Sequence, residues 1–475
     1  MILIKNKSIW INNIHKSSRN IPNNFNTDVL IIGGGITGLT TAYFLCDSIK
    51  NITLIDRDNI GSGVTSKTTA KVTYLQGNIY NQLDKNFGRD ISKRYLNSQV
   101  EAVSIIKNII SDNKISCDLV KTDSIVFTTL DNDVSKINNL NKLLTSWNID
   151  VKYVDHPKIK KGIKVSDTYC FNPLKYLDGL KKAIEDSVNI YEKVLATDVR
   201  LVDDKYHVQT NKGIIVANKV IIACFYPFFL LPSFIPLKTY IKREYVNAAK
   251  VEKIGNFSAV NIDKELHSVR FYKDYLIYGS NQQRLTSKID YKVMYNQSRE
   301  DFKKYFGVEP EYTWMNQDIV SNDNLPFIGN IHKNLYIATA YNAWGMTNGT
   351  IAAKTISDLI LKGYSPYKNI FDPKRKNPTL FIDSLLGSFH YVKAYAQALW
   401  KKNNPSYVKI KGIIYGVYID DNNERHIVKL ICPHMKCSLV FNREEKTWDC
   451  PCHGSRFDLD GNIILGPAIK NIGKE

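Results

Sequence analysis

The stretch Asp28-Val-Leu-Ile-Ile-Gly33-Gly-Gly35-Ile-Thr-Gly38-Leu decides the fold of the first part of the chain. Its apolar run, residues 28–32, predicts a buried parallel strand, and the segment 39–46 after the glycines predicts a helix. Residues 52–56, Ile-Thr-Leu-Ile-Asp, predict a second strand. Strand, glycine-rich turn, helix and strand in this order are typical of a unit that binds a dinucleotide.

The three glycines of this turn have separate physical tasks. Gly33 permits a tight turn, Gly35 lets the backbone approach a pyrophosphate, and Gly38 lets the helix pack close to the strand. The free N–H groups at the helix N-terminus would then hold the phosphate. Asp56, at the end of the second strand, would accept hydrogen bonds from a ribose diol. A glycine-rich loop without a ligand is the alternative, but the order of the elements around it favours dinucleotide binding.

Composition narrows the class of protein. The 475 residues correspond to roughly three domains, and 44% hydrophobic with 23% charged residues is typical of a folded chain. No run of roughly 18 apolar residues occurs, so we expect no transmembrane segment. The first residues lack the apolar core of a signal peptide, so we expect a cytoplasmic protein. The net charge is +18, but the basic residues form no dense cluster, and we expect no nucleic-acid partner.

Four further segments resemble the D-amino-acid-oxidase-like family of FAD-dependent oxidoreductases. They are 61–71 (GSGVTSKTTAK), 219–224 (KVIIAC), 323–329 (DNLPFIG) and 335–349 (LYIATAYNAWGMTNG). The resemblance covers residues 28–365 and implies an α/β (α+β) FAD-binding domain of the Rossmann type. Since no second Gly-x-Gly-x-x-Gly occurs, we expect no separate NAD domain. The residues that the resemblance and the turn assign to FAD are Gly33, Gly35, Gly38, Asp56, Arg57, Thr68, Thr69, Ala223, Gly329, Gly345, Met346 and Thr347.

The same resemblance implies a division of the chain. The FAD-binding domain would be discontinuous, with residues 28–75, 151–225 and 321–365, and residues 76–150 and 226–320 would form an inserted antiparallel-sheet domain on the substrate side. Residues 1–27 predict an extension over the surface. Residues 366–402 predict a linker and an amphipathic helix, which packs on a neighbouring domain or lies on a membrane surface. Residues 403–475 predict a small all-β domain.

Two arginines and two residues of the late loop are candidates for the substrate side. Family members bind a substrate carboxylate through an arginine of the antiparallel sheet, which makes Arg243 and Arg270 candidates here. Both could instead be solvated or paired in salt bridges. Trp344 and Met346 occupy the loop that faces the flavin in the family, and core packing is the alternative for both. No catalytic acid or base is assigned.

Cysteines and histidines cluster near the C-terminus. Cys432-Pro-His434 and Cys450-Pro-Cys-His453 offer two thiolates and two imidazoles, a set that could bind zinc. Together with the later Gly466-Pro-Ala, the pattern resembles the Rieske [2Fe–2S] family, in which the thiolates hold one iron and the imidazoles hold the other. The resemblance makes Cys432, His434, Cys450 and His453 the ligands. It also implies a Cys437–Cys452 disulfide, unusual in the cytoplasm, and a hydrogen bond from Ser455 to the cluster.

The two cofactors together suggest a function. FAD takes two electrons as a hydride, whereas a Rieske cluster takes one, and the whole chain resembles bacterial FAD-dependent oxidoreductases with a C-terminal Rieske domain. We expect oxidation of a small substrate, an amine or amino acid, with electrons leaving singly through the cluster to an external acceptor, a protein or a quinone. The alternative is a reductase that takes electrons from NAD(P)H or a ferredoxin-like donor for a protein partner. A Rieske oxygenase is excluded because the remaining histidines offer no two-His-one-carboxylate iron site.

Overall fold

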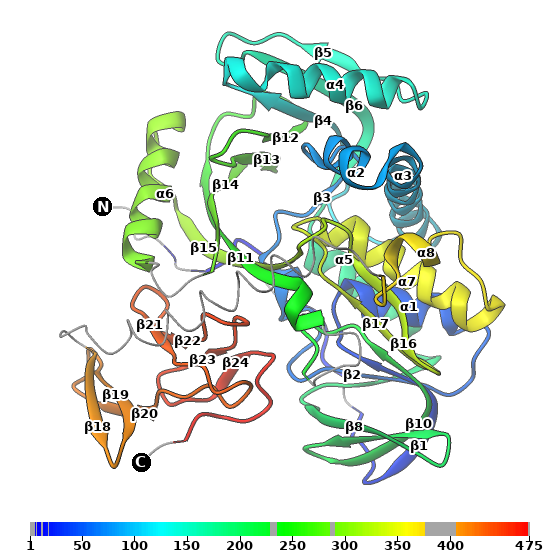
Figure 1. Cartoon of the computed structure of the whole chain (residues 1–475), viewed down its shortest axis with the longest axis vertical. Helices are drawn as coiled ribbons and strands as arrows, with labels where there is room; N and C mark the ends of the chain where they lie inside the picture. Colours follow the sequence, from blue (N-terminus) through cyan, green and yellow to red (C-terminus); the bar gives the residue numbers. More distant parts are fainter. Residues whose placement is uncertain are drawn as a thin grey trace.

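The computed structural model describes residues 5, 7–10, 13–17, 19–228, 235–285, 290–375 and 405–473. Figure 1 shows two large sheets in the part before residue 375 and two small sheets in the C-terminal part. The predicted amphipathic helix at 380–402 lies outside the described residues. Within them, no helix combines the length and the apolar character needed to cross a bilayer.

The first large sheet contains the predicted dinucleotide-binding unit. Its strand order is β16-β17-β10-β1-β2-β7, and β9 pairs with β10 and, on its other side, with β8. β1 pairs in parallel with both β2 and β10, as predicted for buried strands of a doubly covered sheet. The strands are β1 (Phe25–Ile32), β2 (Ile52–Ile55), β7 (Val188–Tyr191), β8 (Ala196–Val202), β9 (Lys205–Thr210), β10 (Gly213–Ile222), β16 (Phe327–His332) and β17 (Leu335–Thr339).

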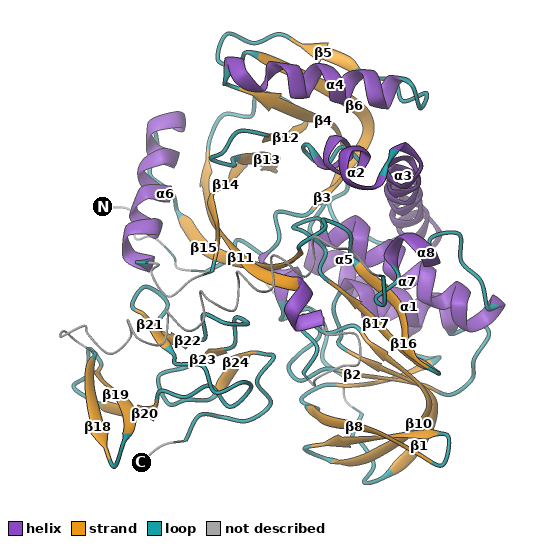
Figure 2. Ribbon diagram, in the orientation of Figure 1, coloured by secondary structure: helices purple, strands orange, loops and turns teal. Residues whose placement is uncertain are grey.

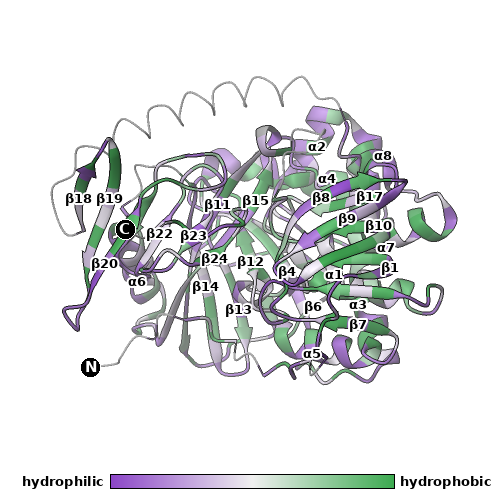
Figure 3. Cartoon of the chain, turned by 90° about the horizontal axis from the view of Figure 1, so that it is seen from below, coloured by the Kyte–Doolittle hydropathy of each residue, from purple (hydrophilic) through white to green (hydrophobic). Residues whose placement is uncertain are grey.

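Helices cover this sheet and bury its apolar strands. Figure 2 shows α1, α5, α7 and α8 gathered beside it, and Figure 3 shows that β1, β10 and β17 are largely hydrophobic. Leu30 and Ile31 of β1 are fully buried on opposite faces of the sheet, since successive side chains of a strand alternate. The helices are α1 (Ile36–Leu45), α5 (Pro173–Ile184), α7 (Gly345–Lys362) and α8 (Lys368–Phe371), with the 3-10 turn η1 (Val64–Lys67).

The second large sheet has the order β15-β11-β14-β13-β12-β4-β6-β3, and β5 pairs with β6. Its pairs are antiparallel except for β4 with β12. β3, β5 and β6 belong to this sheet although they lie within 28–75 and 151–225, because β6 pairs with β4 over most of its length. The strands are β3 (Lys71–Val72), β4 (Val120–Thr128), β5 (Lys152–Val154), β6 (Lys161–Cys170), β11 (Thr239–Lys250), β12 (Phe257–Asn261), β13 (Ser268–Tyr272), β14 (Tyr275–Arg284) and β15 (Tyr312–Ser321).

Helices also pack on this second sheet. α6 packs against β11 and β14, and α4 packs against β4 and β6. These two helices are α4 (Val134–Thr145) and α6 (Tyr291–Phe306). α2 (Ile79–Phe87) and α3 (Arg89–Asp112) pack against each other, and α3 also packs against α7. The 3-10 turns are η2 (Asp131–Asp133) and η3 (Ile235–Lys238).

The C-terminal part, residues 405–473, is a small β unit with its own core. Trp448 is fully buried in that core. A Cβ atom at Gly416 would lie 2.3 Å from the Trp448 ring, so only glycine leaves room for the indole. The strands are β18 (Ser406–Ile410), β19 (Ile413–Ile419), β20 (Arg425–Lys429), β21 (Val440–Asn442), β22 (Thr447–Asp449), β23 (Arg456–Phe457) and β24 (Ile463–Leu465). Figure 1 shows β21–β24 beside β11 and β15.

Candidate functional site

The glycine turn between β1 and α1 is closely packed. A Cβ atom at Gly33 would lie 2.7 Å from the carbonyl oxygen of Ala223, and one at Gly38 would lie 1.8 Å from that of Gly33. The φ of Gly33 is 117°, which L side chains rarely adopt. The turn therefore brings bare backbone N–H groups to the start of α1, as anion binding requires.

Asp56 follows β2 and sits beside the turn. Its carboxylate accepts hydrogen bonds from the backbone N–H groups of Gly34, at 2.7 Å, and Asp58, at 2.8 Å. Burial raises the pKa of this carboxyl despite those two bonds. Asp56 thus fixes the turn as well as facing the cavity in which a ribose would lie.

A cavity of about 220 Å³ opens over this turn. Of the residues assigned to FAD, eight line it, namely Gly33, Gly35, Asp56, Arg57, Thr68, Ala223, Gly345 and Met346. The other four are not among the lining residues and have different contacts. Gly38 packs against Gly33, the Thr69 carbonyl accepts from Arg270, Gly329 lies in β16, and Thr347 accepts from Gln76. Trp344 precedes α7 and is not among the lining residues.

The loop before α7 carries strain at the cavity wall. Ala340 and Ala343 both line the cavity and both have positive φ, 62° and 68°. Glycine adopts this conformation far more cheaply than alanine. Alanines give no sequence signal for a left-handed loop, so this feature was not predicted.

Part of the polar lining of the cavity comes from β15, which the sequence reasoning missed. Asn316 and Asp318 line the cavity, and they stand opposite Glu244 and Lys242 of β11. The Asn316 amide donates to Asp318 at 3.0 Å, while its buried Oδ1 has no hydrogen-bond partner among the described residues. Burial and the nearby Glu244 raise the pKa of Asp318 to about 7.

Lys71 belongs to the same polar group. Its ammonium donates to Thr69 Oγ1 at 3.0 Å and to Ser268 Oγ at 3.1 Å. Burial lowers the pKa of Lys71 to about 8, and the opposite charge of Glu244 limits the drop. Asp318 and Glu244 therefore face the same interior as Lys71 and Lys242. The pKa of Asp318 is raised and that of Lys71 is lowered, so both values move toward neutral pH.

The structure gives Arg243 and Arg270 partners other than a substrate. Arg243 is fully buried on the opposite face of β11 and pairs with Asp449 of the C-terminal unit at 2.8 Å. Arg270 donates to the backbone carbonyls of Thr69 and Ala70 at 2.8 and 2.7 Å. Since side chains alternate along a strand, Arg243 faces away from the side that carries Glu244.

The four predicted cluster ligands lie on two adjoining loops of the C-terminal unit. Cys432 and Cys450 are 0% and 1% exposed, and the rings of His434 and His453 lie 5.1 Å apart. A hydrogen bond from the Cys450 thiol lowers the pKa of Cys432 to about 7, which favours a thiolate. Two buried thiols beside two imidazoles fit the donor set of a Rieske [2Fe–2S] cluster.

Three links hold these loops together. The Cys437–Cys452 disulfide is formed and joins the two ligand loops. The Ser455 hydroxyl accepts from the backbone N–H of Ala468 at 3.0 Å, which ties in the third loop, and it also lies within hydrogen-bonding reach of Cys432. Lys436 has a φ of 59°, a conformation better suited to glycine.

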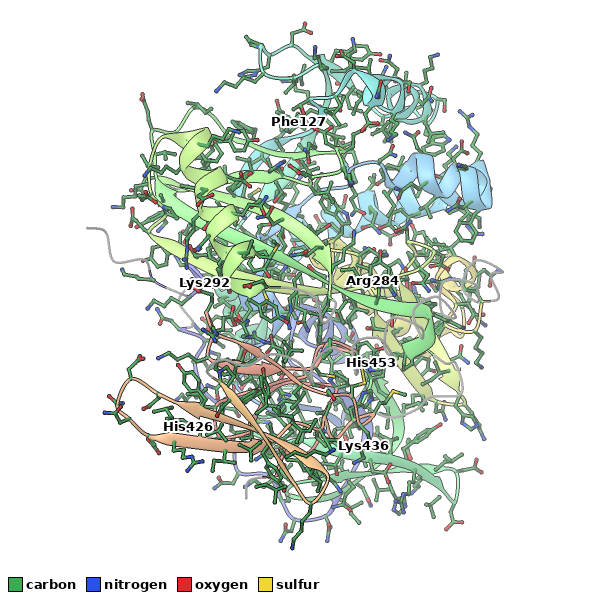
Figure 4. All side chains as sticks on the ribbon, turned by 60° about the vertical axis from the view of Figure 1, so that its left-hand side comes forward. Phe127, Arg284, Lys292, His426, Lys436 and His453 are labelled. Atoms are coloured by element: carbon green, nitrogen blue, oxygen red, sulfur yellow. A yellow bond between two sulfur atoms is a disulfide. The ribbon has the colours of Figure 1, made fainter. Side chains whose placement is uncertain are left out.

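The two sites share a wall. Residues 465–469 of the C-terminal unit line the same cavity as the glycine turn, and Arg57 donates to the carbonyl of Ile464 at 2.6 Å. Tyr226 lines the cavity too, and its ring lies 5.6 Å from that of His453. Figure 4 shows His453 on the side of the unit next to the rest of the chain, and His426 in the outer sheet. This shared wall could not be predicted from sequence, because its parts are more than 200 residues apart.

Comparison with known proteins agrees with both sites. Residues 28–359 match the FAD dependent oxidoreductase (DAO) family, and residues 390–474 match the Rieske [2Fe–2S] domain. A Bacillus subtilis protein, named as a candidate Rieske 2Fe–2S iron–sulfur protein (YhfW), is 30% identical over 93% of this chain and 92% of its own. The γ-glutamylputrescine oxidoreductase of Escherichia coli is 20% identical over 70% of this chain and 83% of its own.

Solved structures show the same fold. Glycine oxidase from Geobacillus kaustophilus superposes with a TM-score of 0.62 at 14% identity, covering 74% of this chain and 99% of its own. The match of the family to 28–359 makes FAD the cofactor of the first part of the chain, and the match at 390–474 makes a [2Fe–2S] cluster, rather than zinc, the metal group of the C-terminal unit. The chain therefore belongs to the DAO family of FAD-dependent oxidoreductases and carries a C-terminal Rieske [2Fe–2S] domain.

Proposed function

We propose that the protein dehydrogenates a small amine or amino acid and passes the electrons, one at a time, through the Rieske domain to an external acceptor, a protein or a quinone. When bound, FAD accepts a hydride and the [2Fe–2S] cluster accepts single electrons. The observation that carries the proposal is the shared wall, in which residues 465–469 of the Rieske domain line the FAD cavity.

The polar residues of β15 suit an amine. An amine can give up a hydride only when its nitrogen carries a lone pair, so a proton must first leave an ammonium substrate. Asp318, with a pKa of about 7, can take that proton at its carboxylate. The unpartnered Oδ1 of Asn316 can accept a hydrogen bond from the remaining N–H.

The cavity favours an amine over a substrate that carries a carboxylate. Carboxylates are held best by the paired N–H groups of arginine. Of the described residues that line the cavity, the one arginine is Arg57, and it already donates to Ile464. Arg243 and Arg270 are committed elsewhere. The E. coli relative is named for γ-glutamylputrescine, a compound with an amine group, which supports an amine as the group oxidised.

An anaerobic mixing experiment tests the proposal. Oxidised holoprotein is mixed with primary and secondary amines, with amino acids and, separately, with NAD(P)H. Flavin absorbance and the electron paramagnetic resonance (EPR) signal of the cluster are then followed. We expect an amine to bleach the flavin and the cluster signal to follow, and the Asp318→Asn variant to bleach more slowly at neutral pH. Bleaching by NAD(P)H alone would overturn the proposal and make the chain a reductase.

A further inference from the structure

We propose that Tyr226 is the side chain through which electrons pass from the flavin site to the Rieske cluster. The inference rests on the proposed function and names the residue that joins its two halves. Tyr226 follows β10, immediately after the segment 223–225 that lines the cavity beside the glycine turn.

One side of Tyr226 faces the FAD cavity and the other faces the cluster ligands. The side chain lines the cavity and the residue is 4% exposed. Its ring lies 5.6 Å from the ring of His453 and 6.5 Å from that of His434. Of the described residues that line the cavity, it is the one with ring contacts to both imidazoles.

The ring is held in place from both ends. The Tyr226 hydroxyl lies 3.3 Å from Thr239 Oγ1, and Thr239 in turn donates to the carbonyl of Ile235 at 3.0 Å. The Tyr226 carbonyl accepts from the Cys224 thiol at 3.3 Å. These contacts all come from the oxidoreductase part of the chain, so they present the ring to the Rieske domain in one orientation.

Two features of electronic structure favour this contact as the route. A delocalised ring couples an electron donor to an acceptor better than a saturated side chain of the same length. The iron held by neutral imidazoles also carries less negative ligand charge than the iron held by thiolates, and so takes the electron more readily. Tyr226 touches the imidazole side.

A competing route runs along β15. Gln317 donates to the carbonyl of Gly454 at 3.0 Å, and its neighbours Asn316 and Asp318 line the cavity. That route runs through a saturated side chain and reaches the backbone beside His453 rather than the ring itself. The variant Gln317→Leu therefore serves as the matched comparison.

The electron balance of the step is simple. Each transfer moves one electron from the reduced flavin to the imidazole-bound iron and makes or breaks no bond in the protein. An external one-electron acceptor then takes the electron from the cluster, and the cycle repeats for the second electron. The proton released on reoxidation of the flavin passes to water.

The experiment uses holoprotein and needs no substrate. The flavin is reduced by a light flash with EDTA as the sacrificial donor, and the rate at which the cluster becomes reduced is followed by absorbance and EPR. We expect Tyr226→Leu and Tyr226→Met to slow this rate by about tenfold or more, and Tyr226→Phe, which keeps the ring, to remain close to wild type. FAD content, cluster content and the cluster midpoint potential should stay unchanged in all three variants.

Three results would overturn the inference. Wild-type rates in Tyr226→Leu together with a slow Gln317→Leu would move the route to β15. A slow Tyr226→Phe would assign the effect to the hydroxyl rather than the ring. A shifted cluster midpoint in both non-aromatic variants would make Tyr226 a packing residue. Failure of the proposed function looks different, because wild-type protein would then show no flavin-to-cluster transfer at all or no bleaching by amines.

Discussion

The ion pair between Arg243 and Asp449 should decide how firmly the Rieske domain docks. Both side chains are fully buried and lie 2.8 Å apart. Arg243 also donates to Gln317 at 2.9 Å and lies over the ring of Tyr291. Removing one member of such a pair costs about 3–5 kcal/mol, because the other charge stays buried.

The two single variants should lower the free energy of unfolding by different amounts. In Arg243→Met, Asp449 keeps a second partner, Arg456, at 3.1 Å, so we expect a loss near the lower end, about 3 kcal/mol. In Asp449→Asn, two buried guanidinium groups lose their shared carboxylate, so we expect a loss near the upper end, about 5 kcal/mol. The double variant Arg243→Met/Asp449→Leu leaves Arg456 paired with Glu445 and should recover part of the loss.

Urea unfolding measures the effect. Cluster absorbance reports on the Rieske domain and flavin fluorescence reports on the FAD site. With an m-value of about 2 kcal/mol/M, a loss of 3 kcal/mol lowers the midpoint by about 1.5 M. In both single variants, we expect the cluster signal to be lost at a lower urea concentration than the flavin signal. A midpoint shift below about 0.3 M in Asp449→Asn, or a milder effect there than in Arg243→Met, would refute the reasoning.

Four further predictions follow from the two cofactor sites. Gly38→Ala should abolish FAD binding, measured as bound flavin per chain, because its Cβ would lie 1.8 Å from the Gly33 carbonyl oxygen. Cys450→Ser should lose the cluster and keep FAD; loss of both cofactors would mean that the two domains fold as one unit. Lys436→Gly should raise stability by about 1 kcal/mol in thermal unfolding, because it relieves a left-handed residue. Asp318 has a raised pKa, so its contribution to stability is full below the unfolded value near 4 and is lost as pH rises through about 7. Asp318→Asn should flatten that part of the stability–pH profile, and an unchanged profile would contradict the assignment.

Local patterns made much of the fold predictable. The strand, glycines and helix of residues 28–46 are contiguous, so their geometry follows from neighbouring residues alone, and the parallel pairing of β1 matches the prediction. The Cys–His spacing near the C-terminus is equally local. The alternation over residues 270–279 predicts one strand, but the segment forms a hairpin in which β13 ends at Tyr272 and β14 begins at Tyr275.

The site residues that escaped prediction depend on distant partners. Arg243 looked available for a substrate because its partner Asp449 is 206 residues away in the sequence. Asp318 carries no motif, and its importance comes from the burial that its pairing with β11 imposes. Tyr226 is one of 28 tyrosines, and only the docking of the Rieske domain distinguishes it.

The placement of residues 465–469 in the wall of the FAD cavity bears on how the protein matures. Because the Rieske domain supplies part of this wall, a chain in which that domain is not yet docked has a wider opening to the glycine turn. FAD can therefore enter most freely before docking, and docking then completes the wall around it.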